Sequence, residues 1–380
     1  MKPEYLDYNA TTPLDPRVFE VMKGWYLGPP ANAGSRTHVY GQRAKEAVEN
    51  ARQQVADVIA AQPEEIFFTS GATESNNIAI LGLTTLGEQT GRRHIISTAI
   101  EHKAVLEPLE EMKRRGFDVD LAPVTQRGSV EVETIKRLLR PDTLLVSVMH
   151  ANNETGILQP IVDLGELLSN TDSFFHTDAA QTFGKEIEEL REAKCDFISI
   201  SGHKIFGPQG VGALFVRRAS GKKRPLEPIV FGGGQERGLR AGTTPVPLTV
   251  GFGEASRLAL SERDCRAKAS VENRKAILDA IAPVAHELNG DQLRCQPHVI
   301  NIRFPNVDSE ALMMAMKDSI AISNGSACTS ASYSASHVLQ AMGLQEDDAN
   351  ECLRISWGSS SKIDGLKLLS DNLKKIEITF

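Results

Sequence analysis

The sequence predicts an α/β fold, in which a large domain with a mainly parallel seven-stranded sheet is followed by a smaller α+β C-terminal domain. Between residues 65 and 216, short apolar runs alternate with longer segments of helical periodicity, which is typical of a parallel sheet with helices on its faces. After residue 245 the pattern changes to a long helical region followed by well-separated strands. The chain has 380 residues, more than one hydrophobic core usually fills, so two domains are expected.

The strands of the large domain are short apolar runs bounded by polar residues. They are predicted at residues 65–69, 94–98, 119–122, 144–149, 174–176, 197–200 and 211–216. The helices that alternate with them are predicted at residues 42–61, 74–86, 105–115, 132–139 and 161–168. Before them, residues 5–13 alternate apolar and polar side chains and predict a strand or an extended arm.

The smaller domain begins with a helical region that extends to about residue 285. Its strands are predicted at residues 298–303, 320–322 and 353–357, with helices between and after them. We place the large domain at residues 15–257, and the small domain at residues 1–14 together with residues 258–380.

Composition narrows the class of protein. A content of 41% hydrophobic and 24% charged residues is ordinary for a soluble enzyme. The net charge of -7 gives no electrostatic reason to bind nucleic acid or an anionic membrane directly. No apolar run approaches a membrane span, and the N-terminus does not open a signal peptide. Five cysteines without CxxC or Cys/His zinc spacing argue against disulfides and a metal site, so we expect a cytoplasmic protein.

The turn at residues 201–210 is the most informative stretch. A lone lysine in a loop is usually a solvated surface charge, but here Ser201 and His203 flank Lys204 and can bind a phosphate. Glycines nearby allow a ligand to approach the backbone, and apolar surroundings lower the pKa of a lysine. A desolvated lysine amine forms Schiff bases with carbonyl cofactors. The turn therefore predicts pyridoxal 5'-phosphate (PLP).

Other polar clusters follow the predicted strands, where ligands bind in open α/β sheets. The glycine turn at residues 70–74 precedes a helix and is a candidate anion site, although most such turns are only turns. His102 follows the strand at residues 94–98 and is either a loop histidine or a group that stacks on a cofactor ring. Asparagines such as those in the turn at residues 152–156 are common in turns.

Asp178 is more specific, because an aspartate at the end of a buried strand is costly unless a cation pairs with it. The protonated ring nitrogen of PLP is such a cation. The alternative, a helix N-cap, is equally compatible with the local sequence. The lysine turn at the end of the next strand decides between them. The glycine-rich residues 232–243 predict a backbone site near an anion.

Cys328 lies in a run of small polar residues, 323–332, and so differs from the other cysteines. A thiol in such a loop is exposed and can act as a nucleophile. The remaining cysteines lie in ordinary helix or strand contexts and are expected to be inert; they are Cys195, Cys265, Cys295 and Cys352.

Together these motifs resemble the cysteine desulfurases of the NifS/IscS type, in the class V aminotransferase family of fold type I PLP-dependent transferases. The resemblance covers nearly the whole chain and is specific because the motifs occur as a set in one order. They are YLDYNATTPLDPRV, SGATESNN, EHKAV, NNETG, HTDAAQ, SGHKIFGPQGVG, GGGQERGLRAGT, SACTS and LRIS.

The resemblance implies a role for each cofactor-binding residue. Lys204 would form the Schiff base with PLP and then move protons. His102 would stack on the pyridine ring and assist acid–base steps. Asp178 would pair with the ring nitrogen, and Gln181 with the phenolic oxygen. Thr73, Ser201 and His203 would bind the phosphate, and Ala72 is a further cofactor-binding residue.

The resemblance also implies the substrate site and a homodimer. Arg354 would hold the α-carboxylate of L-cysteine as a bidentate fork. Asn153 would contact both cofactor and substrate, and Asn32 the substrate. Thr243 would reach the phosphate of the partner subunit, which implies two copies of the chain.

In the implied reaction, Cys328 takes the sulfur of L-cysteine as a persulfide and alanine is released. The sulfur then passes to an acceptor protein, in iron–sulfur cluster assembly with its associated metal binding, in tRNA thiolation, or in DNA phosphorothioation. The acidic charge implies that this partner, and not the chain itself, contacts nucleic acid.

Two departures from the family bear on the pathway. Residues 359–361 are serines, where an arginine and paired threonines are usual, and they suggest a changed helix cap. The chain ends at Phe380, whereas members dedicated to iron–sulfur assembly carry a further tail, so a role in tRNA or DNA modification is an alternative. An aminotransferase, a selenocysteine lyase and a catalytically idle scaffold are the competing functions.

Overall fold

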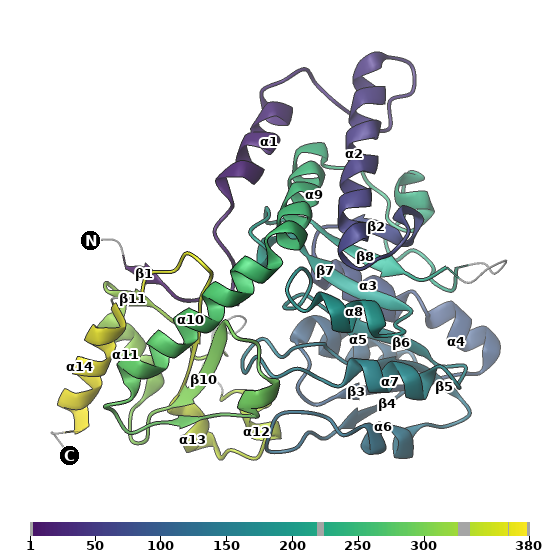
Figure 1. Ribbon diagram of the computed structural model, residues 1–380. Coiled ribbons are helices and arrows are strands. Elements are labelled where there is room, and N and C mark those ends of the chain that lie inside the picture. Colours follow the sequence, from purple (N-terminus) through teal and green to yellow (C-terminus); the bar gives the residue numbers. More distant parts are fainter. Residues whose placement is uncertain (1–2, 219–223, 326–334, 364, 378–380) are drawn as a thin grey trace.

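The computed structural model describes residues 3–218, 224–325, 335–363 and 365–377. Figure 1 shows a large α/β part, and beside it a smaller part that contains both ends of the chain. Among the described residues, no helix has the length and apolar content needed to cross a membrane.

The large part is built on the predicted seven-stranded sheet, with the strand order β2-β8-β7-β6-β5-β3-β4. Pairing is parallel from β4 to β7, whereas β8 is antiparallel to both of its neighbours. The strands are β2 (Ile66–Thr69), β3 (His94–Thr98), β4 (Asp118–Ala122), β5 (Thr143–Ser147), β6 (Phe174–Asp178), β7 (Phe197–Ser201) and β8 (Gly212–Val216). The predicted mainly parallel sheet is therefore confirmed.

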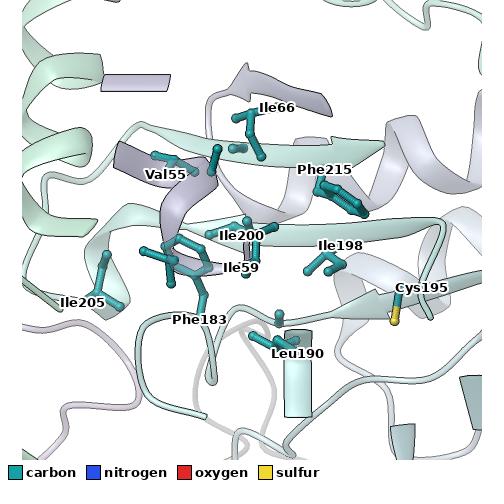
Figure 2. Packing of buried hydrophobic residues seen from close by; sticks show 14 of the residues in the cluster. Val55, Ile59, Ile66, Phe183, Leu190, Cys195, Ile198, Ile200, Ile205 and Phe215 are labelled. Carbon is teal, nitrogen blue, oxygen red and sulfur yellow. The ribbon is translucent and has the colours of Figure 1, made fainter. Parts of the chain in front are cut away.

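Alternate residues of these strands enter different cores, because successive side chains of a strand point to opposite faces. Phe68 packs in the core on one face of the sheet, and its neighbour Phe67 in the core on the other. Ile96 and Ile95 divide in the same way. Figure 2 shows the first core, in which Val55 packs near the sheet with other large apolar side chains.

Helices cover both faces. The face that buries Phe68 is covered by α1 (Pro16–Tyr26), α2 (Val39–Val58), α6 (Val132–Leu138), α7 (Ile161–Leu168), α8 (Ile187–Glu192) and α9 (Val246–Ser261). The other face is covered by α3 (Ala72–Leu81) and α5 (Lys103–Arg114). Helix α4 (Thr84–Thr90) follows α3.

The helix predicted at residues 74–86 is in fact two helices, α3 and α4. They separate at Gly82, whose carbonyl oxygen accepts a hydrogen bond from the amide of Glu227 at 2.9 Å. A Cβ atom at Gly82 would lie 2.9 Å from the Glu227 carbonyl oxygen, so a distant segment packs directly on this backbone. The break was not predicted because the apolar periodicity of a segment does not report contacts with a distant part of the chain.

The smaller part contains a three-stranded antiparallel sheet and a two-stranded parallel one. Its strands are β1 (Glu4–Tyr5), β9 (Glu287–Leu288), β10 (Val299–Arg303), β11 (Ile320–Ala321) and β12 (Cys352–Ser356). Its helices are α10 (Arg263–Ile281), α11 (Ser309–Met316), α12 (His337–Ala341), α13 (Glu346–Asn350) and α14 (Gly365–Glu377). The long helical region predicted here is thus divided into α9 and α10.

The N-terminal residues belong with this smaller part. Strand β1 pairs with β11, and Leu6 lies in the same hydrophobic core as Ile300 and Ile355. The assignment of residues 1–14 to the small domain, and the boundaries at residues 15 and 257, stay a prediction.

Candidate active site

Residues at the carboxyl ends of β3, β5, β6 and β7 line one cavity of about 440 Å³. Ten of the predicted site residues line it: Ala72, Thr73, His102, Asn153, Asp178, Gln181, Ser201, His203, Lys204 and Arg354. A larger open groove of about 1100 Å³ lies at the opposite ends of β6 and β7 and contains none of them. The topology thus brings scattered motifs to the edge of the sheet where α/β proteins bind ligands.

Asp178 ends β6 with only 7% of its surface exposed. One carboxylate oxygen accepts a hydrogen bond from Nδ2 of Asn76 at 2.7 Å, and the other from the amide of Ala180 at 2.9 Å. The residues after Asp178 form turns, and the next helix begins at Ile187, so the N-cap alternative is wrong. Within the described part of the chain, no lysine, arginine or histidine forms an ion pair with this carboxylate. Asp178 therefore suits a cationic ligand group.

Asn76 was missed by the sequence analysis. It lies on α3, three positions after Thr73, so both side chains are on the same side of the helix. That spacing within SGATESNN was the available signal.

Lys204 lies in the short 3-10 helix η2 (Gly202–Lys204) that follows β7. Its amine donates hydrogen bonds to the carbonyl oxygens of Asn9 and Ala10, the latter at 2.7 Å. Thr12 Oγ1 donates to the carbonyl oxygen of His203 at 2.9 Å. The arm predicted at residues 5–13 therefore holds the lysine turn, a role that sequence patterns did not indicate.

His102 is the N-cap of α5. Its Nδ1 accepts a hydrogen bond from the amide of Ala104 at 3.0 Å, which leaves Nε2 as the nitrogen able to hold or give up a proton. Burial lowers the pKa of His102, and the negative charge of Asp178 opposes that shift. A neutral imidazole at neutral pH suits ring stacking and proton exchange.

The turn before α3 and the lysine turn together form an anion site. Gly71 has a φ of 153°, a conformation that favours glycine, and it caps the positive end of the α3 dipole. Ser201 and His203 line the cavity nearby. His203 Nδ1 lies 3.0 Å from Thr11 Oγ1, and burial lowers the pKa of His203 to about 4. A neutral His203 can still donate one hydrogen bond to a phosphate.

Arg354, on β12, is 1% exposed. Its Nη1 donates to the carbonyl oxygen of Asn153 at 3.0 Å, and its Nη2 forms an ion pair with Asp7 at 2.6 Å. Its Nε is buried and finds no hydrogen-bond partner among the described residues. Asp7 is a second residue that the sequence analysis missed, although it lies in a quoted motif.

Two of the predicted residues, Asn32 and Thr243, do not line this cavity. Asn32 is exposed between α1 and α2, where its Oδ1 accepts a hydrogen bond from the amide of Gly34 at 2.8 Å. Thr243 is also exposed, and neither residue lines the cavity of its own chain. Cys328 falls outside the described residues. In the glycine-rich segment before Thr243, Arg240 pairs with Glu74 at 2.8 Å.

The predicted serine cap also differs. Ser361 Oγ accepts a hydrogen bond from the amide of Gly358 at 2.9 Å and closes a turn, well before α14 begins at Gly365. No group of three potential metal-ligating side chains occurs within the described ranges.

The family model described as "Aminotransferase class-V" matches residues 4–369. The chain belongs to the class-V aminotransferase family. The predicted family and fold type are thereby confirmed, because the match covers both parts of the fold and all of the site.

Curated relatives carry a more specific name. "Cysteine desulfurase, mitochondrial" from Arthroderma benhamiae is 45% identical over 368 residues, 96% of this chain and 73% of the relative. The protein of the same name from Drosophila melanogaster is 44% identical over 379 residues, 99% of this chain and 81% of the relative.

Solved structures that are similar to this chain in fold and sequence support the same family. DndA from Streptomyces lividans is 50% identical with a TM-score of 0.82, over 92% of this chain and 98% of that one. A NifS-like protein is 35% identical with a TM-score of 0.91 over the full length of both chains. SspA, solved in complex with cysteine, is 36% identical with a TM-score of 0.83, over 94% of this chain and 100% of that one.

The expected cytoplasmic location is contradicted by the relatives, since those from Arthroderma benhamiae and Drosophila melanogaster are named mitochondrial. The expectation rested on the cysteines, and Cys195 and Cys352 are free thiols in the structure. Cysteine usage does not distinguish one reducing compartment from another, which is why the inference failed.

Proposed function

We propose that this chain is a PLP-dependent cysteine desulfurase in which Cys328 receives the sulfur of L-cysteine and passes it to an acceptor protein. The activity and the cofactor are those of its family relatives, which are cysteine desulfurases at 44–45% identity over nearly the whole chain. One observation carries the assignment to this site: Lys204, Asp178 and Arg354 line the same cavity.

The residues present fit PLP. The cavity of about 440 Å³ is large enough for the cofactor and a small amino acid. Asp178 is a buried anion for the ring nitrogen, and Gln181 Oε1 is buried without a hydrogen-bond partner among the described residues. Ser201 and His203 would hold the phosphate, with the N-terminus of α3 supplying a favourable dipole. Lys204 would bind the aldehyde carbon.

When bound, the cofactor supplies an electron sink for the substrate Cα. Arg354 would orient the substrate through its α-carboxylate, and Asn153 would contact both molecules. The amine of Lys204, once released, would carry the proton to and from Cα, and Nε2 of His102 would hold or return a second proton. Burial keeps His102 neutral and able to exchange that proton.

The sulfur step balances without an external oxidant. The thiolate of Cys328 forms an S–S bond with the substrate sulfur as the C–S bond breaks. The electron pair of that bond remains on the substrate carbon, which takes up a proton and becomes the methyl group of alanine. The products are one alanine and one persulfide on Cys328. A thiol of the acceptor protein then takes the terminal sulfur in an exchange of the same kind.

The same proposal includes a homodimer. Exposed apolar side chains flank the two predicted residues that lie outside the cavity of their own chain. Phe231, 84% exposed, precedes the segment that leads to Thr243, and Leu27, 78% exposed, precedes Asn32. Each has an exposed apolar neighbour in the sequence, Tyr26 beside Leu27 and Val230 beside Phe231, and exposed apolar surface of this kind is typical of protein interfaces. If a second copy of the chain covers these side chains, Thr243 of each chain would approach the cavity of the other chain.

The acceptor is a protein, in keeping with the net charge of -7, which does not favour direct contact with nucleic acid. Iron–sulfur assembly, tRNA thiolation and DNA phosphorothioation differ in the acceptor that each would supply. Transfer of labelled sulfur from L-cysteine to purified acceptors of each kind separates them.

The activity test incubates the purified protein with PLP, L-cysteine and a reductant, and measures alanine and sulfide, with Cys328→Ala beside it. Equal amounts of alanine and sulfide from the wild type, and neither from the variant, are expected. Alanine production independent of Cys328 would contradict the nucleophile and indicate a lyase. A protein that binds no PLP would indicate an idle scaffold instead.

A further inference from the structure

The turn at residues 152–156 is where the small domain meets the cofactor-binding part. Arg354 donates a hydrogen bond to the carbonyl oxygen of Asn153 at 3.0 Å, and Asn301 Nδ2 donates to that of Glu154 at 3.3 Å. These two contacts come from neighbouring strands, β12 and β10. The turn therefore joins the substrate-holding arginine to the sheet edge.

This turn is internally rigid. The Oδ1 atom of Asn152 accepts hydrogen bonds from the amides of Glu154 and Thr155, at 2.9 and 3.0 Å, and from Oγ1 of Thr155 at 3.3 Å. Nδ2 of the same asparagine donates to the carbonyl oxygen of Ile100 at 3.0 Å. These hydrogen bonds fix the backbone of the turn, and with it the Cα position of each side chain that projects from it.

The side chain of Glu154 projects from it and is 3% exposed. Ser336, the N-cap of α12, donates a hydrogen bond from Oγ to Oε2 of Glu154. Gly325 packs on the same carboxyl group, since a Cβ there would lie 2.9 Å from Oε2. Gly325 and Ser336 are separated in the sequence by the segment that contains Cys328. One buried carboxyl group thus contacts the chain on both sides of that segment.

We propose that Glu154 is a positioning residue for sulfur transfer, which holds Gly325 and Ser336 in a fixed relation to Arg354. It would not touch substrate or cofactor, because it does not line the cavity.

Glu154 can affect the position of the thiol because the chain between Gly325 and Cys328 is short. Only three peptide links separate Gly325 from Cys328 in the sequence, and three residues of extended chain span at most about 11 Å. A shift of Gly325 therefore moves the region that the thiol can reach. A misplacement of about 1 Å in a reacting group can lower a rate by about a hundredfold.

This inference rests on the proposed function, and its test separates two steps of the reaction. The first is L-cysteine binding, followed through the absorbance change of the PLP-loaded enzyme. The second is single-turnover formation of the Cys328 persulfide, followed by mass spectrometry. Glu154→Ala is expected to leave cysteine affinity within about twofold and to slow persulfide formation by tenfold or more.

Two variants distinguish positioning from folding. The amide of Glu154→Gln keeps an oxygen that can accept the hydrogen bond from Ser336, so this variant is expected to restore persulfide formation. Ser336→Ala removes the other partner and should slow the same step. Because Ser336 also caps α12, Asp308→Ala, which removes the cap of α11, serves as the matched control and should leave both steps unchanged.

The outcomes are distinct. A loss confined to persulfide formation in Glu154→Ala and Ser336→Ala, with rescue by Glu154→Gln, supports the proposal. A smaller effect, or an equal loss of cysteine binding, overturns it. If Cys328→Ala also forms alanine at the wild-type rate, then the proposed function fails and not this inference alone. If Glu154→Ala does not fold, the test rests on the other two variants: slow persulfide formation in Ser336→Ala with near wild-type formation in Glu154→Gln supports the proposal, and any other result overturns it.

Discussion

The carboxylate of Asp7 lies 2.6 Å from Nη2 of Arg354, so the N-terminal arm holds the arginine that faces the cavity. Arg354 is 1% exposed, and the side chain of Asp7 is 20% exposed. The arm and β12 are far apart in the sequence, and their contact places a fixed cationic fork beside Asp178 and Lys204 in one cavity.

Arg354→Lys is expected to raise KM for L-cysteine by about 10- to 100-fold, with a smaller effect on kcat. A lysine cannot make the two parallel hydrogen bonds that a guanidinium makes to a carboxylate, and each charged bond contributes about 1.5–3 kcal/mol. Steady-state alanine formation measures both constants. Arg303→Lys, on neighbouring β10 and paired with Glu351 at 2.7 Å, is the control. An unchanged KM in Arg354→Lys would rule out the carboxylate role.

Asp178→Asn is expected to reduce kcat by about a hundredfold or more, because a neutral amide cannot stabilise a protonated ring nitrogen. The amide still fits the hydrogen bond geometry with Ala180, so the protein should fold normally. Asn76→Ala, which removes only the hydrogen bond at 2.7 Å, should have a smaller effect in the same direction. Alanine formation under saturating L-cysteine gives the rates, and wild-type turnover in Asp178→Asn would refute the assignment.

Lys204→Ala is expected to abolish covalent attachment of PLP. Borohydride treatment followed by mass spectrometry of the denatured protein should find the cofactor on the wild type and none on the variant. Lys185→Ala controls for the loss of another buried amine near the site. Cofactor trapped equally on Lys204→Ala would show that a different lysine binds it.

Folding stability should depend on pH through Lys185, whose amine lies 3.1 Å from Nε2 of His298. Burial lowers the pKa of Lys185 to about 7. Between pH 7 and about 10 the unfolded chain binds the proton that the folded chain has lost, so stability rises with pH in this window and the penalty is constant below it. The free energy of unfolding increases by up to about 4 kcal/mol across this window, and partial contact of Lys185 with solvent reduces this increase.

Urea unfolding at several pH values measures this slope. Lys185→Met should be more stable than the wild type near pH 7 and should lose most of the dependence. Lys275→Met, at a side chain that is 79% exposed, should leave the slope unchanged. A parallel slope in Lys185→Met and the wild type would contradict the lowered pKa.

Glu236→Gln is expected to cost about 3–5 kcal/mol of folding free energy, because it removes the one buried carboxylate of the two that pair with Arg52 among the described residues. Glu236 contacts Arg52 at 2.6 Å and accepts a hydrogen bond from the amide of Phe68 on edge strand β2 at 2.8 Å. Glu49→Gln is the matched control, since Glu49 also contacts Arg52, at 3.3 Å, but is 52% exposed. Equal stability of the two variants, measured by urea unfolding, would contradict the prediction.

Patterns in the sequence were sufficient for the seven strands of the large sheet and for helices α2, α5, α6 and α7, whereas α1 and α8 were not predicted. An apolar run bounded by polar residues has few alternatives to a buried strand. The strand at residues 94–98 and the helix at residues 161–168 occur with the predicted ends. Sequence patterns also predicted that Asp178 and Lys204 lie at the same edge of the sheet, because the carboxyl ends of neighbouring parallel strands meet there. The motif set indicated the family, which the comparison with known proteins confirms.

Contacts between distant segments were decided only by tertiary structure. Nothing local to Asp7, Asn76 or Glu154 marks the partner that each meets, because those partners lie 347, 102 and 182 residues away. The break at Gly82 has the same origin. Short-range periodicity reports which face of an element is buried, whereas hydrogen bonds and ion pairs across the fold depend on how the sheet, the arm and the small domain pack together.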